Sequence, residues 1–577
     1  MGRQRMVEET QTNTSEPTLF TTRFVWVSAI LTFVVAAFVA LRIYGPSVRP
    51  DELGFLVNGQ LLIGRNETPF SDEFRSFYPI GFSFVTALAA LIGRTLSREF
   101  RIALFFNFAF VALTARILSL FVRKYFALSR NYSRVVAISV SLMPLVAANA
   151  LFAWSESLNI LGFTAIIYCA FNYCTDNTRI YAIALALIAP FLAITHGRFT
   201  LVLPFTLLLL VIAPLATKSF RSSVKTIIGS VLLMVFTYLV LAKANLWLRN
   251  ELYQGAAGKE GRMKDRVLDT ANWGNIVRAL NGQNWYLLTT SFGLVFVGAF
   301  ILFKLFATSQ RRVRPDLAVA SLFTLGAIGI IELTSATNMV KIIRPDHVVY
   351  GRYSGVVAPL LIAIAVSALI TSPRQTLALW WKSIVLIPAL ALSLIILSRG
   401  DVMHRMLKEG EFFARPNAIG LDWAIKATKP TSLFVLSSIF VMLAIVMCLI
   451  HRFATKLFIP FFVAVALFFT GYTTTQTVRN YRDYLPELVL DNEALNRGAK
   501  MVGFDSGAYG GQSFYDYRYL LHPAQVRRIN LVYGVPDDIN CFVGAKERPP
   551  FDGNWAVGPV EPSTGLILWL RDGLDSC

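Results

Sequence analysis

The sequence predicts a polytopic α-helical membrane protein that carries a small soluble domain at its C-terminal end. Of its 577 residues, 55% are hydrophobic and only 15% are charged, a composition that soluble globular domains do not reach. The net charge of +19 comes from short clusters of lysine and arginine between apolar stretches, which is the distribution that sets membrane orientation. Because the basic residues follow this pattern, we expect no binding of nucleic acid.

Apolar stretches long enough to cross a bilayer define a membrane domain over residues 23–472, and they number about thirteen. The stretches are 24–41, 102–122, 135–153, 157–173, 180–195, 199–216, 224–242, 285–306, 316–333, 354–371, 383–397, 431–450 and 457–472. The polar segment 1–22 precedes them as a cytoplasmic tail. The first stretch is too long, and too poorly followed by small residues, to be a cleaved signal peptide, so we expect it to remain as the first span.

A further apolar stretch at residues 80–93 decides the predicted topology. It carries no charge, yet its length is typical of a helix that lies in the membrane interface rather than across it. If this helix lies on the outer surface, the basic clusters of the later loops all face the cytoplasm, as the positive-inside rule requires. These clusters are 123–134, 218–225, 311–314, 374 and 452–456. We therefore expect a plasma-membrane protein with a cytoplasmic N-terminus and an external C-terminal domain over residues 473–577.

The loops that this topology places outside contain most of the unusual polar residues. The acidic pair Asp51 and Glu52 follows the first span, and Glu156 stands between two later spans. Ionisable groups at the edge of a bilayer are costly and usually tied to function. The same loops also hold His196, Arg198, Arg344, His347, Tyr350, Arg352 and Tyr353. The pattern predicts a site on the outer face, with Glu332 near the end of the ninth span as a weaker candidate.

These features resemble the GT-C superfamily of integral-membrane glycosyltransferases, which use polyprenyl-phosphate or polyprenyl-diphosphate sugars. The resemblance rests on the Asp51-Glu52 pair, the helix led by Tyr78-Pro79, Glu156, the number of spans and the external C-terminal domain. The Tyr350-Gly351-Arg352-Tyr353 stretch and the tail are most similar to actinobacterial cell-envelope members such as the arabinofuranosyltransferases. The resemblance implies an enzyme that transfers a sugar from a polyprenyl-phosphate donor to a cell-envelope glycan, lipid or protein, with membrane lipids around it.

Transfer of a sugar from a lipid phosphate needs a base beside the acceptor hydroxyl, and a carboxylate is the usual choice. We assign this role to Asp51. Adjacent carboxylates cannot both face one point, so Glu52 is expected to bind acceptor hydroxyls or to buttress the loop; alternatively, the pair caps the following helix. Glu156 is expected to bind the acceptor, to orient an arginine, or to share a divalent cation with Asp51. The metal stays open, because the sequence has no Asp-x-Asp pair or histidine cluster.

The departing lipid phosphate needs cationic groups beside it, and an arginine fork matches phosphate oxygens better than lysine does. The cationic candidates are Arg198, Arg344, His347 and Arg352. Tyr350 and Tyr353 add hydrogen bonds or stacking. The alternative is an aromatic belt in which arginine reaches toward lipid headgroups. His196 is expected either to bind phosphate or to satisfy a backbone carbonyl.

Two further segments extend this prediction. The external loop 243–284 mixes basic and aromatic residues, which is typical either of an interfacial gate for the donor or of a solvated connector. The tail alternates short apolar runs with polar stretches and predicts a small α/β domain that binds acceptor glycan or acts as a structural cap. Its two cysteines, Cys541 and Cys577, could pair in an oxidising compartment.

A lipid-linked glycan transporter or flippase is the main alternative function. A transporter places ionisable groups near the bilayer midplane and shows repeat symmetry. In this sequence Arg116 is the main charge within a span, whereas the acidic residues gather at one edge of the membrane. This distribution favours the transferase. A receptor or scaffold would explain the tail but not the charged edge.

Overall fold

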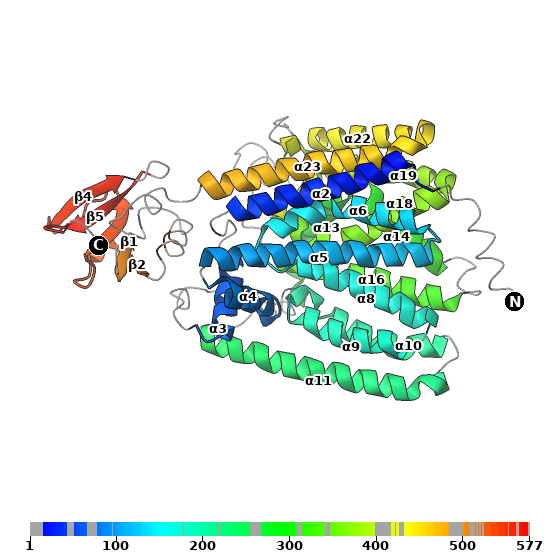
Figure 1. The fold of residues 1–577 in the computed structure, drawn as a ribbon, viewed down its shortest axis with the longest axis horizontal. Coiled ribbons are helices and arrows are strands. Elements are labelled where there is room, and N and C mark those ends of the chain that lie inside the picture. The colour runs from blue at the N-terminus through cyan, green and yellow to red at the C-terminus, as the bar shows by residue number, and fades with distance from the viewer. Residues whose placement is uncertain are drawn as a thin grey trace.

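The chain folds into a bundle of long, roughly parallel helices that is joined to a small β-sheet domain (Figure 1). The described residues of this computed structural model are 16–42, 45, 51–65, 78–94, 96–176, 178–216, 220–253, 266, 268–307, 314–340, 347–398, 417–421, 423–425, 432–483, 500–505, 507, 514, 517, 521, 524–551, 553–560 and 565–574. The last helix of the bundle ends on the side that faces the sheet domain (Figure 1).

Among the described residues, ten helices are long and apolar enough to cross a membrane, and two bent helix pairs raise the number to twelve if each pair is one span. The helices that contribute to the ten spans are α2 (Leu19–Arg42), α5 (Leu96–Tyr125), α8 (Glu156–Asp176), η2 (Gly197–Phe199) with α10 (Val202–Ala216), α11 (Phe220–Tyr253), α16 (Pro315–Asn338), α17 (Gly351–Ser354) with η6 (Gly355–Val357) and α18 (Ala358–Thr371), α19 (Pro373–Leu397), α22 (Leu433–Phe453) and α23 (Thr455–Asp483). The sequence-based prediction of about thirteen also counted α9 (Arg179–Ala193), which is shorter than a span.

Helix α9 ends at Ala193, and the residues just beyond it contact α4 (Ile80–Gly93), the apolar helix that decides the predicted topology. The backbone N–H of Gly81 donates to the carbonyl of Ile194, just beyond α9, at 3.0 Å. The N–H of Ile80 donates to Asn245 Oδ1 of α11 at 2.9 Å. Helix α4 and its neighbour α3 (Asp51–Leu62) lie at the end of the bundle nearest the sheet domain (Figure 1). This placement is compatible with an interfacial helix, and the side of the membrane remains a prediction.

The two bent pairs break where the backbone cannot continue a helix. Helix α6 (Arg130–Ser141) meets α7 (Pro144–Ala147) and η1 (Ala148–Leu151) at 68°, because Pro144 cannot donate a helical hydrogen bond. Helices α13 (Trp273–Thr290) and α14 (Leu294–Ala307) meet at 105°. At that break Gly293 has a φ of +84°, a conformation that glycine adopts without strain. The indole N–H of Trp380 holds the turn by donating to the Phe292 carbonyl at 2.7 Å.

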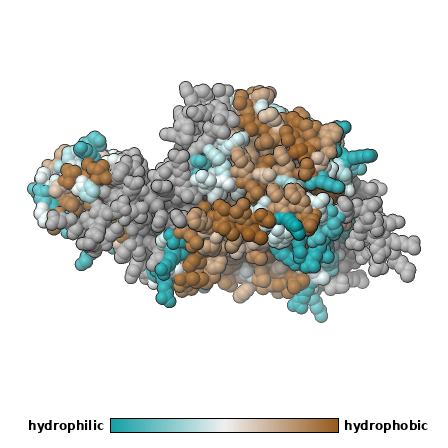
Figure 2. All heavy atoms as spheres, turned by 45° about the horizontal axis from the view of Figure 1, so that its top comes forward, coloured by the Kyte–Doolittle hydropathy of each residue, from teal (hydrophilic) through white to brown (hydrophobic). Residues whose placement is uncertain are grey.

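Burial separates the central helices of the bundle from those that face lipid. In the α17–α18 span, 89% of the most apolar window is buried, whereas in α11 the value is 17%. A helix that is apolar all round belongs either in a protein core or in contact with lipid, so α18 lies at the centre and α11 at the periphery. Figure 2 shows one face of the bundle largely covered by apolar side chains, with hydrophilic ones gathered toward its ends.

The prediction of a long external loop over residues 243–284 is wrong for most of its length. Helix α11 continues to Tyr253, and α13 begins at Trp273. The extension of α11 is stabilised by a tertiary contact, since the side chain of Asn245 accepts a hydrogen bond from the first turn of α4. A hydropathy profile does not reveal such a contact. Of the four basic residues in the proposed gate, Arg266 donates to the Asn338 carbonyl at 3.2 Å, and Lys259, Arg262 and Lys264 lie outside the described residues. Helix α23 likewise continues to Asp483, past the boundary predicted at residue 472.

The C-terminal domain contains a five-stranded mixed sheet in the order β2-β1-β3-β5-β4. The strands are β1 (Met501–Asp505), β2 (Gln525–Ile529), β3 (Cys541–Ala545), β4 (Trp555–Val560) and β5 (Leu566–Arg571). Strand β1 runs parallel to β2 and β3, and β5 runs antiparallel to β3 and β4. Successive residues of β5 enter two different buried clusters, as the two-residue repeat of a strand requires. The sheet confirms the predicted soluble domain. Cys541 is disulfide-bonded, and Cys577 lies outside the described residues.

The contact between α4 and the residues after α9 can be tested by adding one methyl group at Gly81. A Cβ at Gly81 would collide with Thr195, and overpacking of this kind costs about 1–3 kcal/mol. We expect Gly81→Ala to lower the midpoint of thermal unfolding of the purified protein. Gly229→Ala is the matched control, because a Cβ at Gly229 of α11 meets nothing within 4 Å. Equal midpoints for the two variants would contradict this account.

Candidate active site

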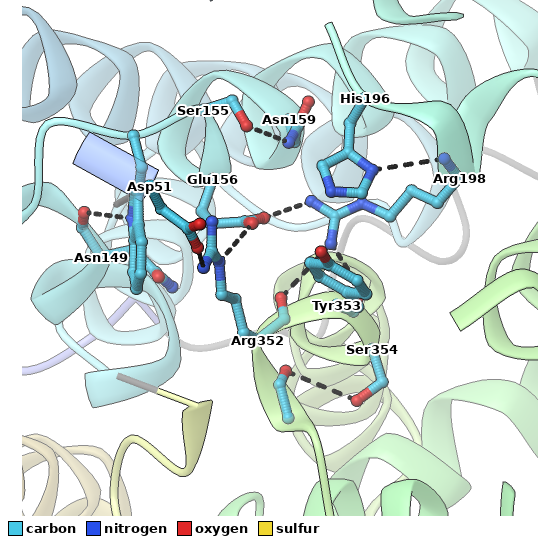
Figure 3. Close-up of polar contacts among 12 residues, drawn as sticks. Asp51, Asn149, Ser155, Glu156, Asn159, His196, Arg198, Arg352, Tyr353 and Ser354 are labelled. Atoms are coloured by element: carbon cyan, nitrogen blue, oxygen red, sulfur yellow. Dashed lines mark hydrogen bonds and ion pairs between the residues drawn. The ribbon is translucent and has the colours of Figure 1, made fainter. Parts of the chain in front are cut away.

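Four charged side chains from separate parts of the chain form a continuous ion-pair network (Figure 3). The guanidinium of Arg352 donates from Nη1 to Asp51 Oδ2 at 2.5 Å and from Nε to Glu156 Oε1 at 2.9 Å. The other carboxylate oxygen of Glu156 pairs with Arg198 Nη2. The four charges alternate in sign and sum to zero. We call this set, Asp51, Arg352, Glu156 and Arg198, the charge network.

Each member of the charge network lies at or near the start of a helix. Asp51 is the first residue of α3, and Glu156 is the first residue of α8. Negative charge is favoured at a helix N-terminus, so the capping alternative and the site prediction are compatible for these two acids. Arg198 lies in η2, between α9 and α10, and Arg352 lies in α17, one turn before α18. Four helix ends therefore meet at one point.

A close approach between α13 and α17 sets the position of Arg352. A Cβ at Gly351 would overlap the ring of Tyr286, so only glycine fits between the two helices. The hydroxyl of Tyr286 in turn donates to the Ile419 carbonyl at 2.7 Å. The guanidinium carbon of Arg352 lies 3.9 Å from the centre of the Trp154 ring, a distance at which an aromatic face attracts a cation. Tyr286 is a site-forming residue that sequence reasoning missed, because a tyrosine within an apolar span carries no distinguishing signal.

Exposure differs sharply along the charge network. The side chains of Arg198, Glu156 and Arg352 are 0%, 1% and 4% exposed, whereas that of Asp51 is 28% exposed. Buried charges are tolerated only when they are paired, and the three buried members satisfy this condition. Asp51 is the accessible end of the network, and its second oxygen accepts a hydrogen bond from the Tyr78 hydroxyl at 2.8 Å. An oriented carboxylate is thus presented to a reactant from outside.

Glu52 does not share the environment of Asp51. Its side chain is fully buried, and Oε1 accepts a hydrogen bond from the backbone N–H of Ala153 at 2.6 Å. This contact joins α3 to the segment that leads into α8. Of the two roles predicted for Glu52, the geometry favours the buttress over contact with acceptor hydroxyls.

The predicted aromatic and histidine residues extend the site beyond the charge network. His196 Nδ1 accepts a hydrogen bond from the backbone N–H of Arg198 at 3.3 Å, and its ring lies 4.6 Å from that of Tyr353. Tyr350 lies 4.7 Å from Tyr353, and His347 lies 6.1 Å from Tyr350 between ring centres. These rings form one series of edge-to-face contacts. Arg344 lies outside the described residues.

The structure also bears on Glu332 and on the possible metal site, which the sequence did not settle. Both carboxylate oxygens of Glu332, in α16, are buried and have no hydrogen-bond partner among the described residues. Within the same part of the chain, no group of three or more histidine, cysteine, aspartate or glutamate side chains is arranged to hold a metal ion. Asp51 and Glu156, the pair considered as metal ligands, are connected through Arg352.

The buried part of the charge network predicts a strong effect on stability. Glu156→Ala would leave two buried arginines without their shared carboxylate, which costs about 3–5 kcal/mol. We expect a large fall in the thermal unfolding midpoint. Asp176→Ala serves as control, because its pair with Lys124 is more than a third exposed on both sides and such pairs contribute about 0–1 kcal/mol. A Glu156→Ala protein as stable as the control would show that the network does not hold the helix ends together.

The fold is similar to that of ArnT from Cupriavidus metallidurans, which has been solved in the apo state and bound to undecaprenyl phosphate. The apo structure superposes with a TM-score of 0.52 at 13% sequence identity, over 94% of this chain and 97% of that one. The bound structure gives 0.53 at 12% identity, over 97% and 99%. The likeness shows that this chain shares the fold of ArnT, and together with the spans it confirms the predicted polytopic helical membrane fold. The sequence itself matches no protein-family description and no curated protein.

Proposed function

We propose that this protein is a membrane glycosyltransferase that moves a sugar from a polyprenyl-phosphate donor to a cell-envelope acceptor on the outer face of the membrane. The observation that carries the proposal is the exposed end of the charge network. Asp51 is accessible and oriented by Tyr78 and Arg352, in a fold shared with a protein solved with bound undecaprenyl phosphate. No described feature favours a flippase over this function.

In the proposed reaction, Asp51 is the general base. The acceptor hydroxyl oxygen attacks the anomeric carbon, the bond from that carbon to the phosphate oxygen breaks, and the lipid phosphate leaves with the bonding electrons. The hydroxyl proton passes to the Asp51 carboxylate, so the charges balance. Before the donor arrives, Arg352 and Tyr78 each hold one oxygen of this carboxylate.

Arg352 has a second proposed role as a ligand of the donor phosphate. Its guanidinium is shared between Asp51 and Glu156, and a phosphate beside it would compete with the Asp51 carboxylate for the same donors. Arrival of the donor would then release Asp51 Oδ2 toward the acceptor hydroxyl. Glu156 is the more buried partner, and it keeps Arg352 paired during this exchange. The mechanism thus couples donor binding to exposure of the base.

Aromatic side chains complete the proposed donor site. Tyr350 and Tyr353 lie beside Arg352, and His196 and His347 extend the row of rings on either side. Such rings provide stacking faces and hydrogen bonds for a sugar or an isoprenoid chain. We assign phosphate or sugar contacts to this row, with Arg344 as a further phosphate ligand. The narrower assignment to arabinofuranosyl transfer in cell-wall biogenesis rests on the Tyr350–Tyr353 stretch, and acceptor binding is assigned to the sheet domain.

Replacement of the base tests the proposal directly. Asp51→Asn keeps the shape of the side chain and a hydrogen-bond acceptor for Tyr78, but it cannot take up the proton. We expect transfer to fall by about 10²- to 10⁴-fold while donor binding and thermal stability change little. Tyr78→Phe is the companion variant, with a smaller loss expected because it removes one hydrogen bond to Asp51 but keeps the carboxylate that takes up the proton. Full turnover by purified Asp51→Asn with a polyprenyl-phosphate sugar would refute the assignment.

A substitution that keeps the positive charge tests whether the planar guanidinium of Arg352 binds the donor. Lysine cannot reach Asp51, Glu156 and a phosphate at once, because it lacks the planar fork. Loss of one charge-assisted hydrogen bond costs about 1.5–3 kcal/mol, so we expect Arg352→Lys to raise the KM for the donor by roughly tenfold or more. Arg314→Lys, in the half-exposed pair with Asp316, should leave the kinetics unchanged. An unaltered KM in Arg352→Lys would remove this arginine from the donor site.

A further inference from the structure

A second candidate site lies in the membrane part of the bundle, separate from the charge network. A cavity of about 550 Å³ opens between α2, α5, α6 and α23. Most of its lining is apolar and includes Trp26, Phe108 and Leu467. Two arginines, Arg116 of α5 and Arg134 of α6, also line it. We call this cavity the arginine groove.

The two arginines lie toward the same end of the bundle. Arg116 stands about two and a half turns before α5 ends at Tyr125, and Arg134 lies in the second turn of α6, which begins at Arg130. This end is opposite to α3 and α4 (Figure 1). The guanidiniums of the arginine groove are therefore far along the helices from Asp51, and they are not part of the proposed transfer site.

Neither arginine has an acidic partner among the described residues. Arg116 is exposed and Arg134 is half-buried, and no ion pair within the described part of the chain includes either one. Glu16, three residues before α2, instead accepts a hydrogen bond from Asn131 at 3.2 Å. A cation on the surface of a spanning helix is costly unless an anion or water accompanies it. The surroundings here are mostly apolar, so an amphiphile that brings its own anion fits the groove best.

We propose that the arginine groove binds one anionic glycerophospholipid of the leaflet on the α5–α6 turn side. Its phosphate would contact Arg116 and Arg134, and its acyl chains would lie along the apolar surfaces of α2 and α23. Basic pockets between membrane helices on the cytoplasmic side, where the positive-inside rule puts this turn, suit such headgroups. A polyprenyl-phosphate donor is disfavoured, because its sugar would be held at the wrong end of the bundle.

The groove also provides a route by which the lipid could affect the transfer site. Ala147 and Leu151 line its other end, in the segment that leads to Ala153, Trp154 and Glu156. The first of these three bonds Glu52, the second stacks on Arg352, and the third belongs to the charge network. A lipid bound in the groove would pack against this segment through Ala147 and Leu151 and stabilise its position.

Lipid binding to the full-length protein tests the proposal without any transfer assay. Delipidated protein in detergent is titrated with phosphatidylglycerol or phosphatidylcholine, and native mass spectrometry counts the bound lipid. An arginine that contacts the lipid phosphate is worth about a fivefold preference for an anionic lipid. We expect the double variant Arg116→Gln with Arg134→Gln to lose roughly thirtyfold in phosphatidylglycerol affinity. The control, Arg123→Gln with Arg130→Gln, removes the same charge from the same two helices outside the groove and should keep the affinity.

A second variant tests the apolar part of the groove without changing charge. Ala112→Trp places a large ring in the cavity lining and should displace the bound phosphatidylglycerol while the protein remains folded. The proposal is overturned if wild type binds the two phospholipids equally, if both double variants lose affinity alike, or if polyprenyl phosphate is bound there in preference to phosphatidylglycerol. Loss of transfer by Asp51→Asn bears on the proposed function alone, so the two proposals fail independently.

Discussion

The charge network of Asp51, Arg352, Glu156 and Arg198 is the interaction on which the end of the bundle with the proposed site depends. Two carboxylates and two guanidiniums from four helix ends neutralise one another, and all but Asp51 are buried. Each charge would be costly alone, and each is tolerated because its neighbours are present. The ion pairs therefore join the helix ends and assemble the candidate site at the same place.

The packing around the network explains why its members can approach so closely. Gly351 leaves room for Tyr286, and Gly81 leaves room for the turn after α9. Glu52 joins the start of α3 to the segment before α8, while Trp154 covers the face of Arg352. These contacts lie outside the ion pairs and hold the surrounding backbone in place. The result is a gradient of exposure that ends at Asp51, the one member of the network open to a reactant.

The candidate site could be predicted from the sequence to a large extent, and the reasons are physical. The four charged residues stand next to long apolar stretches, where ionisable groups are costly and usually tied to function. They are Asp51, Glu156, Arg198 and Arg352. Their pairing could not be predicted, because it depends on how helices far apart in sequence pack. The different roles of Asp51 and Glu52 also required the structure. Two adjacent carboxylates look alike in sequence, yet one is accessible and the other holds a backbone N–H.

Hydropathy and the distribution of lysine and arginine were sufficient for the membrane class, nearly all of the spans and the separate C-terminal domain, because these depend on transfer of local segments from water into lipid. Segments whose partners are other protein segments were predicted less well. Helix α9 ends early against α4, and α11 continues past its apolar stretch because Asn245 bonds that same helix. Only the tertiary structure decides such endpoints and brings the four charges together, because both result from contacts between residues that are distant in the chain.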